Sequence, residues 1–370
     1  MSASRTPGCI FRAHICPFPS PYRPSSWISP FQVISQFQAR KLCKTASRAN
    51  KPLQRYGYGK VHLSRPQPQY QPFPGVNVQD PPEYGSHDGH NPGFAPKTNY
   101  LRPLIWAGTV TAGLYVGFAF LEGFSTRTQE SFVKSLWSKP RPTNPGPEQV
   151  LMNAWNSTDP ITRLSIGIIG VNGMIHMTEN LATRFWMRLW HIPAENKNYT
   201  LFTSAWVHSG FMHIGMNMYV LYNFLPIVGN SRLFESNAYH TFAFYAGTAI
   251  LSGYGQHLTS MWQKSSRRVM MGGASGALFA VVGAFATLYP YERLGIMFLP
   301  FSFDAQSFLV CLMAFDLVGA IKGYKFVNLG HGAHLTGALL GVAYARFDGN
   351  THLWKPLTRA LYQLRMSFEK

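Results

Sequence analysis

Three apolar segments of this chain carry polar side chains whose types could do covalent chemistry. Ser275 lies in GGASGALFA, His334 in GHGAHLTGALLG, and His213 and Asn217 lie in WVHSGFMHIGMNM. Polar and ionisable side chains are costly inside a lipid bilayer, so each of the four is a candidate functional residue. A hydroxyl, an imidazole and an amide are together the groups that acyl transfer uses.

Ser275 is the candidate nucleophile. Gly273 and Gly276 flank it, and because they have no side chains they leave its hydroxyl uncovered. A serine among small residues more often serves helix packing or bonds to its own backbone, so this motif alone is weak evidence. A serine hydroxyl also needs a base, because it does not ionise unaided near neutral pH.

His334 is the candidate base, and a histidine that is hydrogen-bonded for structural reasons is the alternative. His334 and Ser275 each lie a few residues into an apolar run, and both runs start from the same side. A helix rises about 1.5 Å per residue, so the two side chains are expected at one depth. His213 and Asn217, at positions i and i+4, share one face of a third helix that starts from that side. They are the candidate donors to an oxyanion.

Other chemistries have less support. The zinc-protease motif HExxH is absent, and Asp316 is solitary, which disfavours a pair of catalytic aspartates. Four histidines could in principle hold a metal or haem, but no carboxylate or thiolate accompanies them: His208, His213, His331 and His334. We therefore expect no metal and no other cofactor.

The elements that must position these side chains are apolar runs. Of 370 residues, 46% are hydrophobic and 13% are charged, and this low share of charge indicates a membrane protein. Seven runs centre on Leu104 to Leu121, Leu164 to Leu181, Ala205 to Pro226, His240 to Leu258, Gly273 to Tyr289, Gln306 to Ile321 and Gly330 to Arg346. A helix needs about 20 residues to span the bilayer, and a helix satisfies its own backbone groups there. The sequence predicts an all-α polytopic membrane protein, although the second run could instead lie at the interface.

The first 97 residues have a different composition. Eleven basic residues and no acidic residue precede Asp80, and prolines are frequent, so no stable domain is expected there. This composition indicates a mitochondrial targeting segment followed by a Pro-rich disordered spacer, and a disordered cytosolic tail is the alternative. Because the residues before Asp80 hold eleven of the eighteen formal net charges, nucleic-acid binding loses its main support.

Loop charges predict an orientation for seven crossings. Loops 182–204, 259–272 and 322–329, on the side of the N-terminal region, carry eight Lys and Arg residues, whereas loops 227–239 and 290–305 carry two. By the positive-inside rule the N-terminal side faces the matrix, if the organelle is the mitochondrion. The connection after the first run and the basic C-terminal tail oppose this orientation.

From roughly residue 160 to 346 the sequence resembles the rhomboid family of intramembrane serine proteases. The resemblance rests on GASG around Ser275, on the H-x-x-x-N of the candidate donors, and on AHLTG at 333–337. The chain looks most like the mitochondrial branch, whose members carry one extra helix before a six-helix core. Thr336 stands where the family commonly has a glycine, and we expect it to change the packing between the fifth and seventh runs.

The resemblance implies a 1+6 arrangement of transmembrane helices. The expected parts are 1–97 as targeting segment and spacer, 98–124 as the extra transmembrane helix, 125–160 as a connecting loop, 161–348 as the six-helix rhomboid protease core, and 349–370 as a basic C-terminal tail.

The resemblance also implies a Ser275/His334 dyad without a third carboxylate member. His334 would take the hydroxyl proton as Ser275 attacks and would return it to the leaving amine. The Ser275 amide and the side chains of His213 and Asn217 would hold the oxyanion. Phe279 would stack on the catalytic imidazole, with plain packing as its alternative role. The supporting residues would be Gly273, Gly276, Phe279 and Gly337.

A site sunk in lipid needs water and a route for its substrate. Polar residues could line a cavity open on the N-terminal side, and packing against one another is their alternative role: Ser204, His208, Ser209 and His331. A substrate would enter laterally between helices and unwind locally, because a regular helix hides its carbonyl groups.

The function that the resemblance implies is intramembrane serine endopeptidase, in a multi-pass protein of the mitochondrial inner membrane. Its partners would be the lipid bilayer and single-pass proteins whose transmembrane segments it cleaves. One alternative is a catalytically inactive relative that binds transmembrane segments, which is expected to lack the serine or the histidine. Another is a transporter or channel that uses the polar helices as a path. The sequence does not fix the oligomeric state.

Overall fold

The computed structural model describes residues 98–136, 146–295, 301–324 and 329–368. They lie in a compact unit that spans residues 85–370. The expected targeting segment and spacer, residues 1–97, fall outside the described residues.

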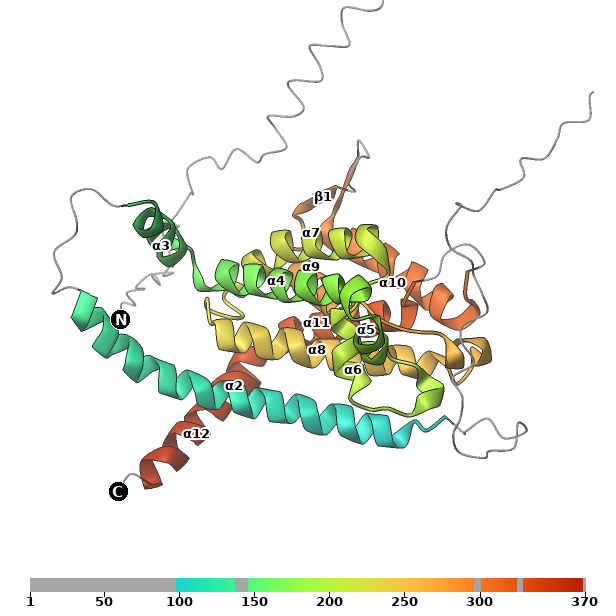
Figure 1. Cartoon of the computed structure of the whole chain (residues 1–370), viewed down its shortest axis with the longest axis horizontal. Coiled ribbons are helices and arrows are strands. Elements are labelled where there is room, and N and C mark those ends of the chain that lie inside the picture. The colour runs from blue at the N-terminus through green and yellow to red at the C-terminus, as the bar shows by residue number, and fades with distance from the viewer. Residues whose placement is uncertain (1–97, 137–145, 296–300, 325–328, 369–370) are drawn as a thin grey trace, which may run out of the picture. The chain divides into compact units, whose positions relative to one another are not determined.

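The described residues are mainly helical, as predicted (Figure 1). The α-helices are α2 (Leu101–Leu136), α3 (Pro147–Ser157), α4 (Pro160–Leu181), α5 (Thr183–Leu189), α6 (Thr200–Thr203), α7 (Gly210–Gly229), α8 (Ala238–Thr259), α9 (Ser275–Leu288), α10 (Ala305–Lys322), α11 (His331–Arg346) and α12 (Lys355–Phe368). Shorter turns are η2 (Pro193–Glu195), η3 (Ser204–Trp206), η4 (Lys264–Arg268) and the π-helical η5 (Asn350–Trp354). The seven apolar runs fall in α2, α4, α7, α8, α9, α10 and α11.

Length and hydropathy identify two helices among the described residues that could cross a membrane. They are Leu101–Phe124 within α2 and Ala305–Lys322, with mean hydropathies of 1.7 and 1.5. Ser275–Leu288 is apolar but shorter. Seven crossings in a 1+6 arrangement therefore remain a prediction.

Two short antiparallel strands precede α10. β1 (Arg293–Gly295) pairs with β2 (Ser302–Asp304), so that Arg293 lies opposite Asp304. Their guanidinium and carboxylate groups are 3.0 Å apart and exposed. The all-α prediction does not include this hairpin, because a strand of three residues is too short to show an alternating pattern.

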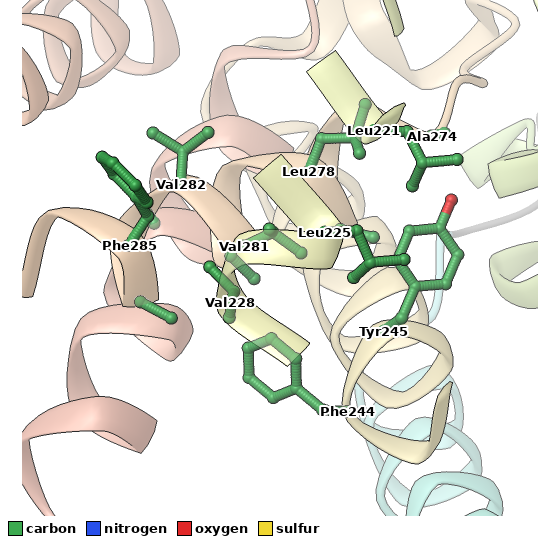
Figure 2. Close-up of a cluster of buried hydrophobic side chains, with 14 of the residues drawn as sticks. Leu221, Leu225, Val228, Phe244, Tyr245, Ala274, Leu278, Val281, Val282 and Phe285 are labelled. Carbon is green, nitrogen blue, oxygen red and sulfur yellow. The ribbon is translucent and has the colours of Figure 1, made fainter. Parts of the chain in front are cut away.

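α9 lies at the centre of the packed core. It is apolar on every face, and α7, α8, α10 and α11 all contact it. A helix that is apolar all round is stable only when it is buried. Figure 2 shows Leu278 and Val281 of α9 in one cluster with Leu225 of α7 and Tyr245 of α8, and Phe285 lies at the other side of this cluster beside Val282. The position of the first turn of α9 is therefore fixed by packing along the rest of the helix.

α11 lies directly against the backbone of α9. A Cβ atom at Gly337 would overlap the carbonyl oxygen of Gly276, and a Cβ atom at Gly341 would overlap that of Ala280. Glycines four residues apart permit this close approach between two helices. The contact fixes the register between α9, which begins with Ser275, and α11, which carries His334.

The Thr336 side chain contacts α8 at Gly255. A Cβ atom at Gly255 in α8 would overlap the Thr336 hydroxyl and would lie 2.6 Å from its Cβ. The expectation that Thr336 changes the packing between the fifth and seventh runs stays a prediction, because this contact is with the fourth run. The additional side chain fills space that a glycine in α8 leaves open.

α2 packs along α8, and α12 packs against α2. The Glu122 carboxylate in α2 accepts hydrogen bonds from Asn237 at 2.7 Å and from Trp354 at 2.9 Å. Asn237 also caps α8, where its side chain accepts a bond from the His240 amide. One carboxylate thus connects α2, the start of α8 and η5. Within the segment 349–370, expected as a basic tail, residues 350–368 form η5 and α12.

Candidate active site

Three helices begin at one cavity. α7, α9 and α11 start with Gly210, Ser275 and His331, and residues of their first turns line a cavity of about 900 Å³. The remaining lining comes from α5, from α8, from the end of α10 and from the segments before α7, α9 and α11. The amide groups of a first helical turn have no partner within the helix, so three sets of such groups gather near this cavity.

Ser275 and His334 are brought together at the wall of this cavity. The Ser275 Oγ and the His334 Nε2 are 2.8 Å apart, which is hydrogen-bond distance. The His334 ring is stacked on Phe279, with centroids 4.1 Å apart and planes 4° apart. Phe279 lies one helical turn after Ser275, so the helix that supplies the hydroxyl also supports the ring.

The backbone before Ser275 is held in place at two points. Gly273 has a φ of +130°, which favours glycine, and its amide donates to the Ser204 carbonyl at 2.8 Å. The Ala274 amide donates to the Nε2 of His208 at 3.2 Å. These two bonds fix the entry into α9 and hence the direction of the Ser275 side chain.

His213 lines the cavity, and its Nε2 lies next to Gly273. Its Nδ1 accepts a bond from the Ser209 amide at 3.3 Å and lies 3.1 Å from the Ser209 hydroxyl. Since Nδ1 accepts from an amide, Nε2 carries the hydrogen of the neutral ring. A Cβ atom at Gly273 would lie 2.9 Å from this Nε2, so only a glycine leaves room for it. The ring can thus offer an N–H group beside Ser275.

Asn217 lies one turn deeper on α7. Its Nδ2 donates to the His213 carbonyl at 2.8 Å, and the side chain is buried. Asn217 is not among the residues that line the cavity, whereas His213 is. Its assignment as an oxyanion donor remains a prediction that depends on the second N–H of its amide.

A carboxylate lies behind the His334 ring. Asp316 of α10 is 1% exposed, and its Oδ1 is 3.3 Å from the Nδ1 of His334 and 2.7 Å from the Nδ1 of His331. The resemblance implies a dyad without a third carboxylate, and along the sequence Asp316 is solitary. Its partners lie 18 and 15 residues further along the chain. Only the packing of α10 against α11 brings them together.

The polar residues expected around the cavity divide into two groups. Ser204, Ser209 and His331 line it, whereas His208 is fully buried and binds the Ala274 amide. His191, another lining residue, lies in the segment before α6. Burial and the nearby His257 lower the pKa of His191 to about 3, so this ring is neutral. Within the described residues, no group of three or more His, Cys, Asp or Glu side chains could hold a metal ion.

Comparison with known proteins gives the same family as the motifs. A family model described as the Rhomboid domain matches residues 195–350, a range that contains Ser275 and His334. Presenilin-associated rhomboid-like protein, mitochondrial, of Rattus norvegicus is 28% identical over 307 residues, which cover 75% of this chain and 76% of that protein. The chain belongs to the rhomboid family. The Homo sapiens protein of the same name is 28% identical to this rhomboid over 315 residues, again covering 75% and 76%.

A yeast relative matches a shorter part of this rhomboid. Rhomboid protein 1, mitochondrial, of Saccharomyces cerevisiae is 32% identical over 145 residues, which cover 38% of this chain and 39% of that protein. The matched relatives and the Rhomboid domain agree on the family.

Proposed function

We propose that this rhomboid is an intramembrane serine endopeptidase that cleaves transmembrane segments of single-pass proteins with a Ser275/His334 pair. The observation that supports this most is the 2.8 Å contact between the Ser275 hydroxyl and the His334 Nε2 at the wall of a cavity. A serine becomes a useful nucleophile only when a base can take its proton within hydrogen-bond reach.

The reaction would proceed through an acyl-enzyme. His334 Nε2 takes the proton of the Ser275 hydroxyl as the oxygen bonds to the substrate carbonyl carbon. The imidazolium then gives this proton to the amide nitrogen as the C–N bond breaks. A water molecule, activated by His334 in the same way, releases the acyl group and restores Ser275.

Donors for the developing oxyanion would come from two helices. The Ser275 amide belongs to the first turn of α9, where it has no partner within the helix. His213 would add its Nε2–H from α7, and Asn217 would assist from one turn below. Removal of one such donor in other enzymes lowers kcat on the order of 10²- to 10³-fold.

The cavity would supply the water that hydrolysis consumes. Its volume of about 900 Å³ and its polar lining at Ser204, Ser209 and His331 suit water. A transmembrane substrate would reach Ser275 only after local unwinding, since a regular helix keeps its carbonyl groups bonded. Small or helix-destabilising residues near the cut would therefore favour cleavage.

The location that fits best is the mitochondrial inner membrane, with the seven apolar helices as crossings. The relatives in rat, human and yeast are all named as mitochondrial proteins. The basic, acid-free composition of the first 79 residues is consistent with import into this organelle. The proposed chemistry uses only side chains, the Ser275 backbone amide and water.

Reconstituted protein tests this function. The probe is a single transmembrane segment with a Gly-Ser pair near one end, fused to a soluble reporter and placed in liposomes with the full chain. We expect cleavage by the unchanged chain and none by Ser275→Ala or His334→Ala, because each removes one half of the proton transfer. The matched control is Ser265→Ala, which alters an exposed serine of the same cavity and is expected to leave the rate unchanged.

The same assay separates the protease from an inactive relative. Circular dichroism and gel filtration establish that each variant is folded. Cleavage that persists in folded Ser275→Ala or His334→Ala would contradict the proposed pair. Binding of the probe without cleavage by the unchanged chain would favour the inactive, segment-binding alternative.

A further inference from the structure

Asp316 is the buried acidic group nearest to the proposed pair, and the reaction described above does not use it. Its side chain is 2% exposed, and one oxygen, Oδ1, lies within hydrogen-bond distance of the Nδ1 atoms of both His331 and His334. A carboxylate in such surroundings is costly unless it is paired and hydrogen-bonded. Two imidazole N–H groups would satisfy it.

The contacts of Asp316 select one tautomer of His334. A carboxylate oxygen only accepts hydrogen bonds, so the Nδ1 that contacts it must carry the hydrogen. The Nε2 of a neutral ring is then unprotonated. This is the nitrogen that lies 2.8 Å from the Ser275 hydroxyl, and it can accept the proton only in this tautomer.

His331 holds the carboxylate from its other side. Its Nδ1 is 2.7 Å from Asp316, against 3.3 Å for His334, and its ring makes edge contacts with Phe315 and Tyr324. A Cβ atom at Gly319 would lie 2.5 Å from the His331 ring, so a glycine one turn after Asp316 makes room for that ring. Asp316 is thus fixed on α10 and bound to both histidines of α11.

We propose that Asp316 is a positioning residue that orients His334, keeps its Nε2 free to accept the serine proton, and stabilises the imidazolium that forms. The inference rests on the proposed protease function and deepens it. The carboxylate keeps no proton at any step. The proton moves from the Ser275 oxygen to His334 Nε2 as the C–O bond forms, and then to the leaving nitrogen as the C–N bond breaks.

A purely structural role is the competing explanation, because the same bonds join α10 to α11. The two roles predict different kinetics. A structural bond affects the amount of folded protein, whereas a positioning bond affects kcat of the folded protein. Conservative substitution by glutamate would restore the carboxylate and part of the kcat, although its longer side chain fits less well.

The test measures kcat and KM for the transmembrane probe in liposomes, using folded protein only. We expect Asp316→Asn to lower kcat on the order of 10²- to 10⁴-fold with little change in KM, as loss of an orienting carboxylate does in other serine hydrolases. Asp316→Glu should be faster than Asp316→Asn. Asp304→Asn is the matched control, because Asp304 is exposed and directly precedes the same helix. Its kcat should not change.

A second measurement does not depend on whether a variant of Asp316 folds. The ¹⁵N chemical shifts of labelled histidine, assigned by comparison with His334→Asn, report which nitrogen of His334 carries the hydrogen. We expect the Nδ1–H form in the unchanged chain and in Ser275→Ala. The Nε2–H form, or an Asp316→Asn kcat equal to that of the unchanged chain, would overturn the inference. Absence of cleavage by the unchanged chain would instead contradict the proposed function. The tautomer of His334 would still test whether Asp316 orients this ring.

Discussion

At the residue scale, the site depends on groups that hold other groups in place. Ser275 and His334 are 59 residues apart in sequence and 2.8 Å apart in space. The Ser209 amide fixes the tautomer of His213, and His208 holds the amide just before Ser275. The proposed chemistry therefore depends on buried hydrogen bonds as much as on the reacting pair.

The two proposed oxyanion donors should contribute unequally. His213 lines the cavity, whereas Asn217 lies beneath it and already donates to a backbone carbonyl. We expect His213→Ala to lower kcat on the order of 10²- to 10³-fold, and Asn217→Ala to lower it less. Steady-state cleavage of the reconstituted probe measures both, with the exposed His352→Ala as a control. A greater loss in Asn217→Ala than in His213→Ala would contradict this order.

The sequence predicts site residues that belong to a local motif better than site residues whose role depends on contacts between distant elements. Small residues around Ser275 and the spacing of His213 and Asn217 are visible along the chain. The partners of Asp316 and His208 are not, because they come from other elements and no local pattern marks them. The sequence signal for such contacts is a lone polar residue in an apolar run, because a buried polar group must find a hydrogen-bond partner. The signal does not say which residue the partner is.

At the element scale, helices approach one another closely where one of them carries a glycine. α11 contacts α9 through Gly337 and Gly341, and it contacts α8 where Thr336 faces Gly255. Hydrophobic periodicity predicts that these helices exist but does not predict which face meets which neighbour. For this reason the contact between Thr336 and Gly255 could not be predicted from the sequence. The hairpin of β1 and β2 could not be predicted because its strands are three residues long, and α12 is not marked by an apolar run because it is polar and basic overall.

Gly255 and Thr336 should behave as a coupled pair. Gly255→Ala would place a methyl group onto the Thr336 hydroxyl, and overpacking of this kind costs about 1–3 kcal/mol of unfolding free energy. Thr336→Gly should recover most of this loss in the double variant, giving a coupling of about 0.5–3 kcal/mol. Denaturation in detergent micelles measures the free energy of unfolding of the unchanged chain, the two single variants and the double variant.

The control for this pair is Gly170→Ala in α4, where no atom lies within 4 Å of the added methyl group. Alanine favours a helix over glycine by up to about 1 kcal/mol, so the control should be neutral or stabilising. Additive effects of Gly255→Ala and Thr336→Gly would show that the two side chains do not compete for the same space.

At the scale of the whole described unit, α2 and the C-terminal segment attach to the core through one acidic side chain. Glu122 joins Asn237 at the start of α8 to Trp354 of η5. None of these residues lines the cavity that contains Ser275. Loss of this attachment should therefore lower the free energy of unfolding without directly changing kcat. The sequence predicts the extra helix but cannot predict this contact, whose partners lie 115 and 232 residues away.

Loss of the Glu122 carboxylate should loosen this attachment. Hydrogen bonds to a charged group contribute about 1.5–3 kcal/mol, so Glu122→Ala should lower the free energy of unfolding by a few kcal/mol. Hydrogen exchange should rise in η5 and α12, while kcat of the folded protein stays unchanged. Glu148→Ala, which alters an exposed glutamate of α3, is the control. Unaltered exchange in η5 and α12 would mean that other contacts hold the C-terminal segment.

The most direct test of the central claim is to find which atom becomes covalently modified. The full chain in liposomes is treated with a fluorophosphonate, which reacts with activated serine hydroxyls, and the adduct is mapped by peptide mass spectrometry. We predict one adduct, on Ser275, that forms at a much lower rate in folded His334→Ala. An unmodified Ser275, or equal labelling with and without the His334 imidazole, would contradict the account.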